Sequence, residues 1–337
     1  MPTIKDVAKL AGVSTATVSH VINGTRYVSQ ELHTRVTEAM ERLKYRPNRL
    51  AQSLRSGETK SIGLIVPDNS NPFFGEVARM CEDIGFQNGY NVILCNSDDS
   101  PEKEAAYINM LITKQIDGVI FISTGSDSGA LLELARLDIP VVITDRDAPD
   151  LNCDRVLVNN QRGGYQATRY LVELGHQRIA CIGGPEKLDT SQQRVKGYRR
   201  ALKEAGLTAL PEYLVHGDFR FQSGEEAMQQ LLQIDPPPTA VFACNDLMAI
   251  GALRALHQAG LQVPEQLSLI SFDNIPFSSA VIPALTCIAQ PVEELARTSM
   301  KLLLDHIKNT DRKRKPRRVI LDPSLVERDS CAPFGVK

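Results

Sequence analysis

The sequence predicts a protein of two parts: a small all-α head, followed by an α/β body with two doubly wound parallel sheets. The chain has 337 residues, which is enough for about two domains and a small extra one. Short helical patterns fill the first 43 residues, and from Ser61 onward apolar runs of strand length alternate with helical patterns. This alternation is typical of parallel sheets that helices cover on both faces.

The head is expected to contain three short helices. The second covers 15–22 and the third covers 30–43. Gly12 ends the first helix, because glycine tolerates the left-handed backbone that a helix C-terminus needs. Hydroxyl side chains that can cap free backbone N–H groups begin the three helices, at Thr3, Ser14 and Ser29. We therefore place the head at residues 1–46.

A linker, 47–60, is expected to follow the head. Within it, Asn48–Arg55 has a short helical pattern with Leu50 and Leu54 on one side. Its eight residues are too few for a stable isolated helix in water. We expect this segment to become helical only when another surface packs on it.

The body, 61–337, is expected to form two subdomains. Its apolar runs predict strands at 62–66, 92–95, 119–122, 141–144, 156–158, 179–182, 213–215, 240–244, 267–271, 286–289 and 319–321. That number of strands fits two doubly wound sheets better than one. We place the N-subdomain at about 61–160 and 291–322, and the C-subdomain at about 161–290 and 323–337.

Charge is distributed unevenly between the two parts. Residues 1–60 hold ten Lys or Arg and five Asp or Glu, whereas the remainder holds 28 basic and 35 acidic residues. A basic head on an acidic body indicates an anionic partner for the head, and nucleic acid is the first candidate. The basic run Arg312–Arg318 is expected to be a solvated loop, with a nucleic-acid patch as the alternative.

The head carries a helix-turn-helix pattern, Ala8-x-x-Ala11-Gly12-Val13-Ser14-x-x-Thr17-Val18-Ser19. Small residues at Ala8 and Ala11 let two helices approach each other, and Val18 packs back on the first helix. Short polar side chains on the second helix can then enter the major groove of DNA. An ordinary α-hairpin is the alternative structure, and the basic charge of the head disfavours it.

The segments Thr3–Asn23 and Tyr45–Leu54 closely resemble the LacI/GalR transcription regulators, and the resemblance extends over the whole chain. It implies a cytoplasmic repressor that binds double-stranded DNA as a homodimer. Each protomer would place its second helix in the major groove of a pseudo-palindromic operator. The resemblance also implies that Asn48–Arg55 is the hinge helix of this family, in which Leu54 wedges into the minor groove and bends the duplex.

The same motif implies roles for individual residues of the head. Base-edge contacts are expected from Thr15, Ala16 and His20, with Ala16 limited to a methyl contact that suits thymine. Arg26 can contact bases or phosphates, and Arg55 is expected at the minor groove or its phosphates. Phosphate contacts, which orient the protein without specifying sequence, are expected from Ser14, Thr17, Ser19, Asn23 and Tyr27. The alternative is helix capping or solvation for each, and a core position for Leu54.

Polar and aromatic residues gather where strands of the body end, and ligands of open α/β sheets bind at that edge. The body resembles periplasmic sugar-binding proteins. One set of residues matches the pocket of periplasmic ribose-binding proteins position by position: Asn71, Phe73, Phe74, Asp145, Arg146, Arg194, Phe219, Asn245, Asp273 and Gln290. The resemblance implies that phenylalanines sandwich a sugar ring while the charged and amide groups bind its hydroxyls.

The implied effector is a small sugar, with D-ribose or a related pentose or furanose as the first candidate. We expect it to act as an inducer that releases DNA. Another sugar and a purine base acting as a corepressor stay as alternatives, because the residues do not settle the sign of the response. A sugar receptor that serves transport is a different class of function, and Met1–Lys9 lacks the apolar segment of a secretory signal.

A sugar-processing enzyme is a further class, but the sequence contains no positioned base and nucleophile, and we expect no catalytic residue, cofactor or metal site. The seven cysteines include no C-x-x-C pair, so we expect reduced thiols. The tail after Val326 has no leucine heptad, so the tetramerising extension of some relatives is not expected.

Overall fold

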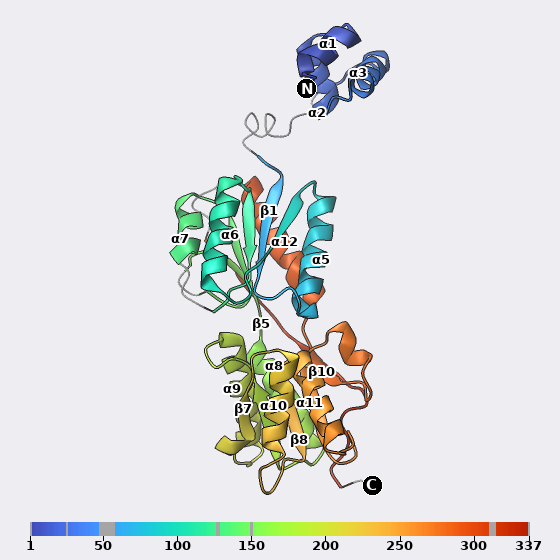
Figure 1. Cartoon of the computed structure of the whole chain (residues 1–337). Helices are drawn as coiled ribbons and strands as arrows, with labels where there is room; N and C mark the ends of the chain where they lie inside the picture. Colours follow the sequence, from blue (N-terminus) through green and yellow to red (C-terminus); the bar gives the residue numbers. More distant parts are fainter. Residues whose placement is uncertain are drawn as a thin grey trace. The chain divides into compact units, whose positions relative to one another are not determined.

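A computed structural model of the chain describes residues 2–24, 26–46, 58–125, 129–148, 151–309 and 315–335. The chain divides into two compact units, Met1–Thr59 and Lys60–Lys337 (Figure 1). No helix of the described residues is long and apolar enough to cross a membrane. All seven cysteines, each within the described ranges, are free thiols.

The first unit contains α1 (Ile4–Ala11), α2 (Thr15–Asn23) and α3 (Gln30–Leu43). Thr3 begins α1 with a capping box: its hydroxyl accepts from the Asp6 amide, and the Asp6 carboxylate accepts from the Thr3 amide at 2.8 Å. Gly12 ends α1 with a left-handed φ of 63°. Ser29 occupies the N-cap position of α3, as expected, but its hydroxyl makes no capping hydrogen bond in the described structure.

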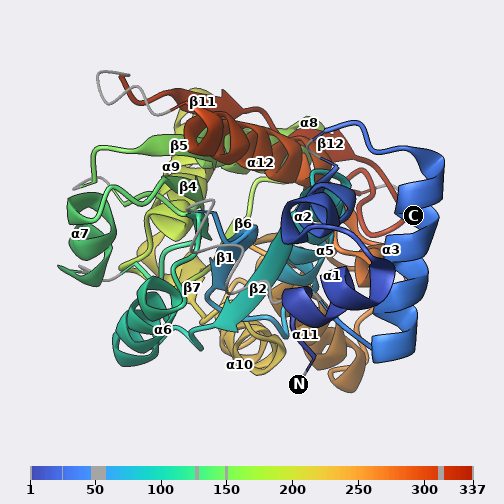
Figure 2. The same ribbon diagram turned by 90° about the horizontal axis from the view of Figure 1, so that it is seen from above.

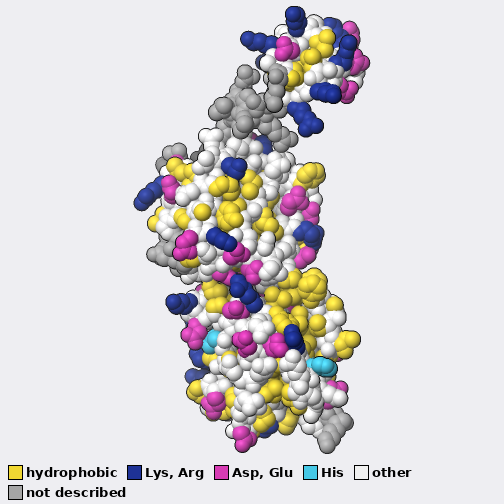
Figure 3. All heavy atoms as spheres, viewed as in Figure 1, with side chains coloured by type: hydrophobic (Ala, Val, Ile, Leu, Met, Phe, Trp, Pro, Cys, Tyr) yellow, Lys and Arg dark blue, Asp and Glu magenta, His cyan; other side chains and the backbone are white. Residues whose placement is uncertain are grey.

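The three helices share a small core that contains Val7 from α1, Val18 from α2 and Val36 from α3, none of which is exposed. Lys and Arg side chains stand around this unit (Figure 3). The first two helices and the turn at Gly12 form the expected helix-turn-helix.

The second unit contains two six-stranded sheets. The first has the strand order β11-β5-β4-β3-β1-β2, and every neighbouring pair in it is parallel. Its strands are β1 (Ser61–Val66), β2 (Asn91–Asn96), β3 (Gly118–Phe121), β4 (Val141–Asp145), β5 (Asp154–Val158) and β11 (Arg318–Leu321). Its helices are α5 (Pro72–Gln87), α6 (Pro101–Thr113), α7 (Gly129–Arg136) and α12 (Val292–Lys308).

Helices cover both faces of this sheet because successive strand residues point to opposite faces. Ile62, Leu64 and Val66 of β1 pack in one core with α5 and α12, whereas Ile65 packs in another core with α6 and α7. In Figure 2, α6 and α7 lie on one side of β1 and α5 lies on the other.

The second sheet has the strand order β12-β10-β9-β8-β6-β7. Its strands are β6 (Ile179–Gly183), β7 (Leu214–His216), β8 (Ala240–Ala243), β9 (Ser268–Asp273), β10 (Thr286–Ala289) and β12 (Ser324–Val326). Its helices are α8 (Asn160–Glu173), α9 (Asp189–Glu204), α10 (Phe221–Leu231), α11 (Asp246–Gln258) and the 3₁₀ turns η1 (Pro211–Tyr213) and η2 (Pro276–Ser279). All strands expected from the sequence occur, with ends that differ by at most two residues.

One edge strand departs from the expected all-parallel sheets. β12 pairs antiparallel with β10, with Cys287 opposite Val326. The cause is the route of the chain, which leaves β11 in the first sheet and enters β12 in the second within a few residues, without a helix that could turn it round.

Two glycines let α9 approach α8 closely. A Cβ on Gly197 would lie 2.2 Å from the Gln161 carbonyl oxygen, and one on Gly164 would lie 2.1 Å from the Arg194 carbonyl oxygen. No side chain fits at either position. This close contact fixes the segment of α9 that carries Arg194.

Candidate functional site

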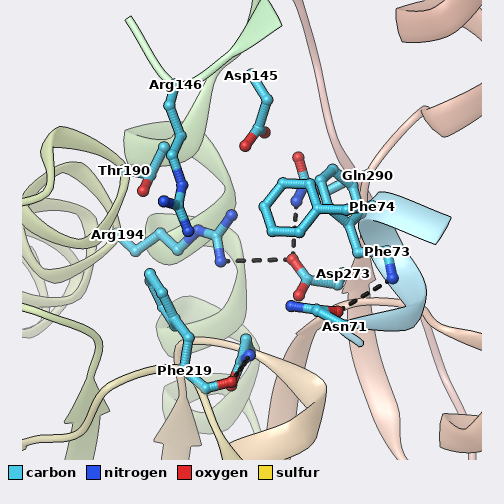
Figure 4. A pocket seen from close by; sticks show the side chains of 11 residues that line it. Asn71, Phe73, Phe74, Asp145, Arg146, Thr190, Arg194, Phe219, Asp273 and Gln290 are labelled. Atoms are coloured by element: carbon cyan, nitrogen blue, oxygen red, sulfur yellow. Dashed lines mark hydrogen bonds and ion pairs between the residues drawn. The ribbon is translucent and has the colours of Figure 1, made fainter. Parts of the chain in front are cut away.

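A pocket lies within Lys60–Lys337, where strands of both sheets end (Figure 4). All ten residues expected at a ligand site line it, together with one that was not expected, Thr190. The pocket offers about 270 Å³ of space, part of which is open to solvent, which suits a ligand smaller than a drug-sized molecule.

Three residues of the pocket have a strained backbone. The φ angles are 63° at Asp145, 69° at Phe219 and 109° at Asp273, in the left-handed region that favours glycine. Asp145 and Asp273 are the last residues of β4 and β9, and Phe219 follows β7. Strained residues persist only where their surroundings hold them, and they concentrate at functional sites.

Phenylalanine rings supply the apolar part of the pocket. Phe73 and Phe74 lie in the first turn of α5, which Asn71 caps by accepting a hydrogen bond from the Phe73 amide at 3.0 Å. The two rings meet edge to face, with centroids 5.1 Å apart and planes at 73°. The Asn71 carbonyl is therefore committed to the helix cap, while its amide group stays available to a ligand.

Arg194 is held in place from several sides. Its Nε donates to Asn160 Oδ1 at 2.8 Å, and its guanidinium stands 3.8 Å from the centre of the Phe272 ring. Its Nη1 lies 3.4 Å from an oxygen of Asp273. Because both members of this ion pair are buried, either one alone would be an uncompensated buried charge.

Arg146 is the second guanidinium of the pocket. It lies 5.3 Å from the centre of the Phe74 ring and donates to Asp99 at 2.9 Å and to the Ser123 carbonyl at 3.3 Å. The first sheet therefore contributes a fixed cation from Arg146 and a carboxylate from the preceding residue, Asp145.

The carboxylates of the pocket are buried. Burial raises the pKa of Asp273 to about 6, although Arg194 and the hydrogen bond from Gln290 lower it. Gln290 Nε2 donates to Asp273 at 2.7 Å. Burial also raises the pKa of Asp145, against the lowering effect of Arg194 and Arg146.

Two oxygen atoms at the pocket have no partner. Oδ1 of Asp145 and Oε1 of Gln290 are buried and accept no hydrogen bond from the described part of the chain. Both belong to residues that line the pocket. Since buried polar atoms are nearly always paired, a bound molecule with hydrogen-bond donors would satisfy them.

Asn245 supports the pocket in two further ways. As the N-cap of α11, its Oδ1 accepts from the Met248 amide at 2.9 Å, and its Nδ2 donates to the Phe219 carbonyl at 2.8 Å. It therefore fixes the strained Phe219 while lining the pocket. Asn245, expected as a ligand-binding residue, thus also has a positioning role, and one of its amide hydrogens stays available to a ligand.

Thr190 was missed by the sequence reasoning. It is buried in the first turn of α9, four residues before Arg194. Residues four apart lie on the same face of a helix, so this spacing from Arg194 is the signal that would have found it. Figure 4 shows Thr190 beside both arginines of the pocket.

In the head, α2 carries most of the residues expected to contact DNA. Thr15, Ala16 and Asn23 are exposed, and Thr17, Ser19 and His20 are partly exposed. Ser14 caps the helix by accepting from the Thr17 amide at 3.0 Å. Asn23 donates to the Ser19 hydroxyl at 3.2 Å, so two expected phosphate contacts also bond each other.

Arg26 and Tyr27 follow α2, and the Tyr27 side chain is almost fully exposed, at 95%. An exposed aromatic side chain beside a helix-turn-helix suits contact with DNA. The expected hinge segment Asn48–Arg55, with Leu54 and Arg55, lies outside the described residues.

Known proteins resemble both parts of the chain. Residues 3–48 match the family described as bacterial regulatory proteins, lacI family, and residues 168–331 match a periplasmic binding protein-like domain. A relative named HTH-type transcriptional repressor PurR, from Aliivibrio salmonicida, is 40% identical over 332 residues, which cover 98% of this chain and 99% of the relative.

Solved structures agree with this likeness. The Lac repressor dimer bound to operator and the anti-inducer ONPF has a TM-score of 0.87 and 28% identity, with 98% of this chain and 99% of that chain covered. A LacI family regulator from Enterococcus faecium with bound ribose has a TM-score of 0.74 and 34% identity, with 81% and 99% covered.

These likenesses extend over nearly the whole chain and include its helix-turn-helix, both sheets and the pocket region. The family consists of regulators rather than enzymes. Since they act on bacterial DNA, the protein works in the cytoplasm. The chain belongs to the LacI family, as a DNA-binding transcriptional repressor that a small effector controls.

Proposed function

We propose that the effector is D-ribose or a closely related pentose, bound in the pocket formed by the ten expected residues and Thr190. The observation that carries the proposal is the composition of the pocket. Two carboxylates, two guanidinium groups, three amides and one hydroxyl surround three phenylalanine rings in a pocket of about 270 Å³. This is a small cavity with more polar groups than a flat apolar ligand can satisfy.

A pentose suits this arrangement because each hydroxyl both donates and accepts a hydrogen bond. Neighbouring hydroxyls can donate to Asp145 or Asp273 and accept from Arg146 or Arg194, and such charge-assisted hydrogen bonds are the strong ones. The unpartnered oxygens of Asp145 and Gln290 would receive two of these donors. The phenylalanine rings would cover the C–H faces of the sugar. The ribose-bound regulator from Enterococcus faecium supports this choice.

A purine base acting as a corepressor is the second candidate, and a specific observation favours it. The relative named PurR is 40% identical over 98% of this chain. A purine would stack on phenylalanine and donate N–H groups to the carboxylates. The edge-to-face arrangement of Phe73 and Phe74 does not offer it two parallel ring faces, however, and the two N–H donors of hypoxanthine are fewer than the hydroxyl donors of a pentose.

In the proposed mechanism, operator DNA orders the hinge segment 48–55 in each protomer of a homodimer. The effector changes how the protomers' first sheets are placed relative to each other, and with it the spacing of the hinges. Two sites are then coupled through an element with two states. D-ribose would favour the state in which the hinge cannot fold, so that the operator is released.

On the operator, α2 would lie in the major groove. Thr15, Ala16 and His20 would contact base edges, while Ser14, Thr17, Ser19, Asn23 and Tyr27 would contact phosphates. Arg26 would contribute to either set. Leu54 and Arg55 would act in the minor groove.

The test combines calorimetry with DNA binding. D-ribose, D-glucose and hypoxanthine are titrated into the purified full chain, and the same ligands are added to a gel shift with a DNA fragment that the protein selects from a random pool. We expect D-ribose to bind and to weaken the DNA complex. Binding of hypoxanthine with a tighter DNA complex would establish the purine alternative, and binding of D-glucose alone would identify another sugar.

A further inference from the structure

The turn Asp273–Ile275 holds the pocket carboxylate Asp273 in a doubly strained backbone. Asp273 has a φ of 109° and Asn274 a φ of 67°, so two consecutive residues other than glycine occupy the left-handed region. Such a turn persists only if contacts outside it hold it. The position of the Asp273 carboxylate therefore depends on whatever holds the turn.

Asp246 holds one side of this turn. It is the first residue of α11, and its side chain is completely buried. One carboxyl oxygen accepts from the Ile275 amide at 2.6 Å, and the other is hydrogen-bonded to the Ser271 hydroxyl. Ser271 lies two residues before Asp273 and Ile275 two residues after it, so a single carboxyl group brackets the turn.

Arg328 holds the other side. It follows β12, and its Nη2 donates to Asn274 Oδ1 at 2.6 Å. Its Nη1 donates to the Leu285 carbonyl at 2.6 Å and to the Ser278 hydroxyl at 3.3 Å. The C-terminal segment thereby fixes the middle residue of the turn to the chain that follows the turn.

The turn Asp273–Ile275 also fixes other residues of the pocket. The Asp273 carboxylate pairs with Arg194 and accepts from Gln290 Nε2, and the Asp273 carbonyl accepts from the Gln290 amide at 3.1 Å. A displaced Asp273 would therefore misplace Arg194 and Gln290 as well. Neither Asp246 nor Arg328 lines the pocket.

We propose that Asp246 and Arg328 are positioning residues that set the affinity for the effector through the turn Asp273–Ile275. The inference rests on the proposed effector pocket, but it holds for a sugar and for a purine alike. The two side chains act as hydrogen-bonding clamps, and Asp246 needs no negative charge to do so. Burial and the neighbouring Asp273 raise the pKa of Asp246 to about 8, in keeping with a role that does not depend on its charge.

Asp246→Ala, Asp246→Asn, Arg328→Ala and Arg328→Lys are compared with two matched controls. Arg254→Ala removes an arginine of α11 that pairs with Glu225, and Ala252→Gly weakens the same helix at a position six residues after Asp246. Calorimetry with D-ribose and with hypoxanthine measures the affinity. Thermal unfolding measures stability, and hydrogen exchange measures the protection of the Ile275 amide.

We expect each alanine variant to weaken the binding of the ligand that wild type binds by about tenfold or more. Asn at position 246 can accept from Ile275 and donate to Ser271, so Asp246→Asn should restore the affinity to within about threefold of wild type. The Ile275 amide should exchange faster in Asp246→Ala. Arg254→Ala and Ala252→Gly should keep wild-type affinity, even where Ala252→Gly lowers the unfolding temperature.

Wild-type affinity in both alanine variants, or an equal loss in Ala252→Gly, would overturn the proposal. If wild type binds neither D-ribose nor hypoxanthine, the proposed effectors are wrong. The exchange rate of the Ile275 amide then still tests whether Asp246 holds the turn. Faster exchange in Asp246→Ala supports it, and unchanged exchange overturns it.

Discussion

The head and the pocket hold their functional side chains in opposite ways. In α2, the bonds that orient the exposed side chains join residues three or four apart, such as Ser14 with Thr17 and Ser19 with Asn23. In the pocket, Arg194 bonds Asn160 and Asp273, which lie 34 and 79 residues away. The functional side chains of α2 are therefore oriented by local bonds, whereas the pocket exists only when the whole second unit is folded.

The largest effect is expected where the pocket depends on distant partners. Arg194→Ala should abolish the response to the effector while the head still binds DNA. It leaves Asp273 as a buried carboxylate without its ion-pair partner, which costs about 3–5 kcal/mol of folding stability, and it removes a charge-assisted hydrogen-bond donor from the effector. Calorimetry and a gel shift with and without D-ribose measure the two functions separately. A normal response in this variant would show that the pocket is misplaced, and Arg254→Ala is the control for loss of an arginine.

A second prediction addresses the proposed hinge. Leu54→Ala removes the side chain expected to wedge between bases, so operator binding should weaken by about tenfold. The affinity for the effector should stay unchanged, because the pocket residues all lie within Lys60–Lys337. Gel shifts and calorimetry on the same preparation test both statements. An unchanged operator affinity would place Leu54 in the core of the protein instead.

A third prediction concerns pH and the buried Asp273. An acid whose pKa is raised in the folded state destabilises the fold above that pKa, and this penalty is lost progressively as the pH falls from about 6 toward about 4, the pKa of the group in the unfolded chain. Relative to Asp273→Asn, the effector-free protein should gain on the order of a few degrees in unfolding temperature between about pH 7.5 and about pH 5. Its affinity for D-ribose should fall over the same range, because protonated Asp273 no longer pairs with Arg194. The absence of either trend would mean that Asp273 titrates outside this range.

The smallest effect is expected at a hydrogen bond of the head that joins residues far apart in the sequence. Arg35 of α3 donates to the Ala11 carbonyl at 2.7 Å, at the turn of the helix-turn-helix. Arg35→Ala should destabilise the head by about 1 kcal/mol and weaken operator binding more than Arg42→Ala, which removes the same charge from the same helix. Equal effects of the two variants would show that only charge matters there.

Sequence patterns predicted most of the fold, because the spacing of apolar residues, the helix-capping residues and the apolar runs of strands are local properties of the sequence. The capping box at Thr3 and the turn at Gly12 follow from residue types next to each other. The ten pocket residues were found by resemblance to a family motif, since no local pattern brings Asn71 near Asp273. The antiparallel β12 was missed because its direction depends on the route of the chain and not on its three residues.

The backbone conformation of the pocket residues could not be predicted from the sequence. The left-handed φ angles of Asp145, Phe219 and Asp273 contradict the ordinary preferences of these residue types. They arise from tertiary contacts such as the bond from Asn245 to the Phe219 carbonyl. At these positions tertiary contacts override the backbone preference of the residue type. Such conflicts are expected at functional sites.

The chain passes three times between the sheets, after β5, after β10 and after β11. These crossings adjoin one another, because β5 pairs with β11 in one sheet and β10 with β12 in the other, and the Asn159 amide donates to Leu321 at 2.8 Å. A single cut in any crossing would leave two covalent connections intact. The two halves therefore cannot be expressed or exchanged as independent modules by cutting at one point, and a chimaera with another regulator must exchange segments at all three junctions together.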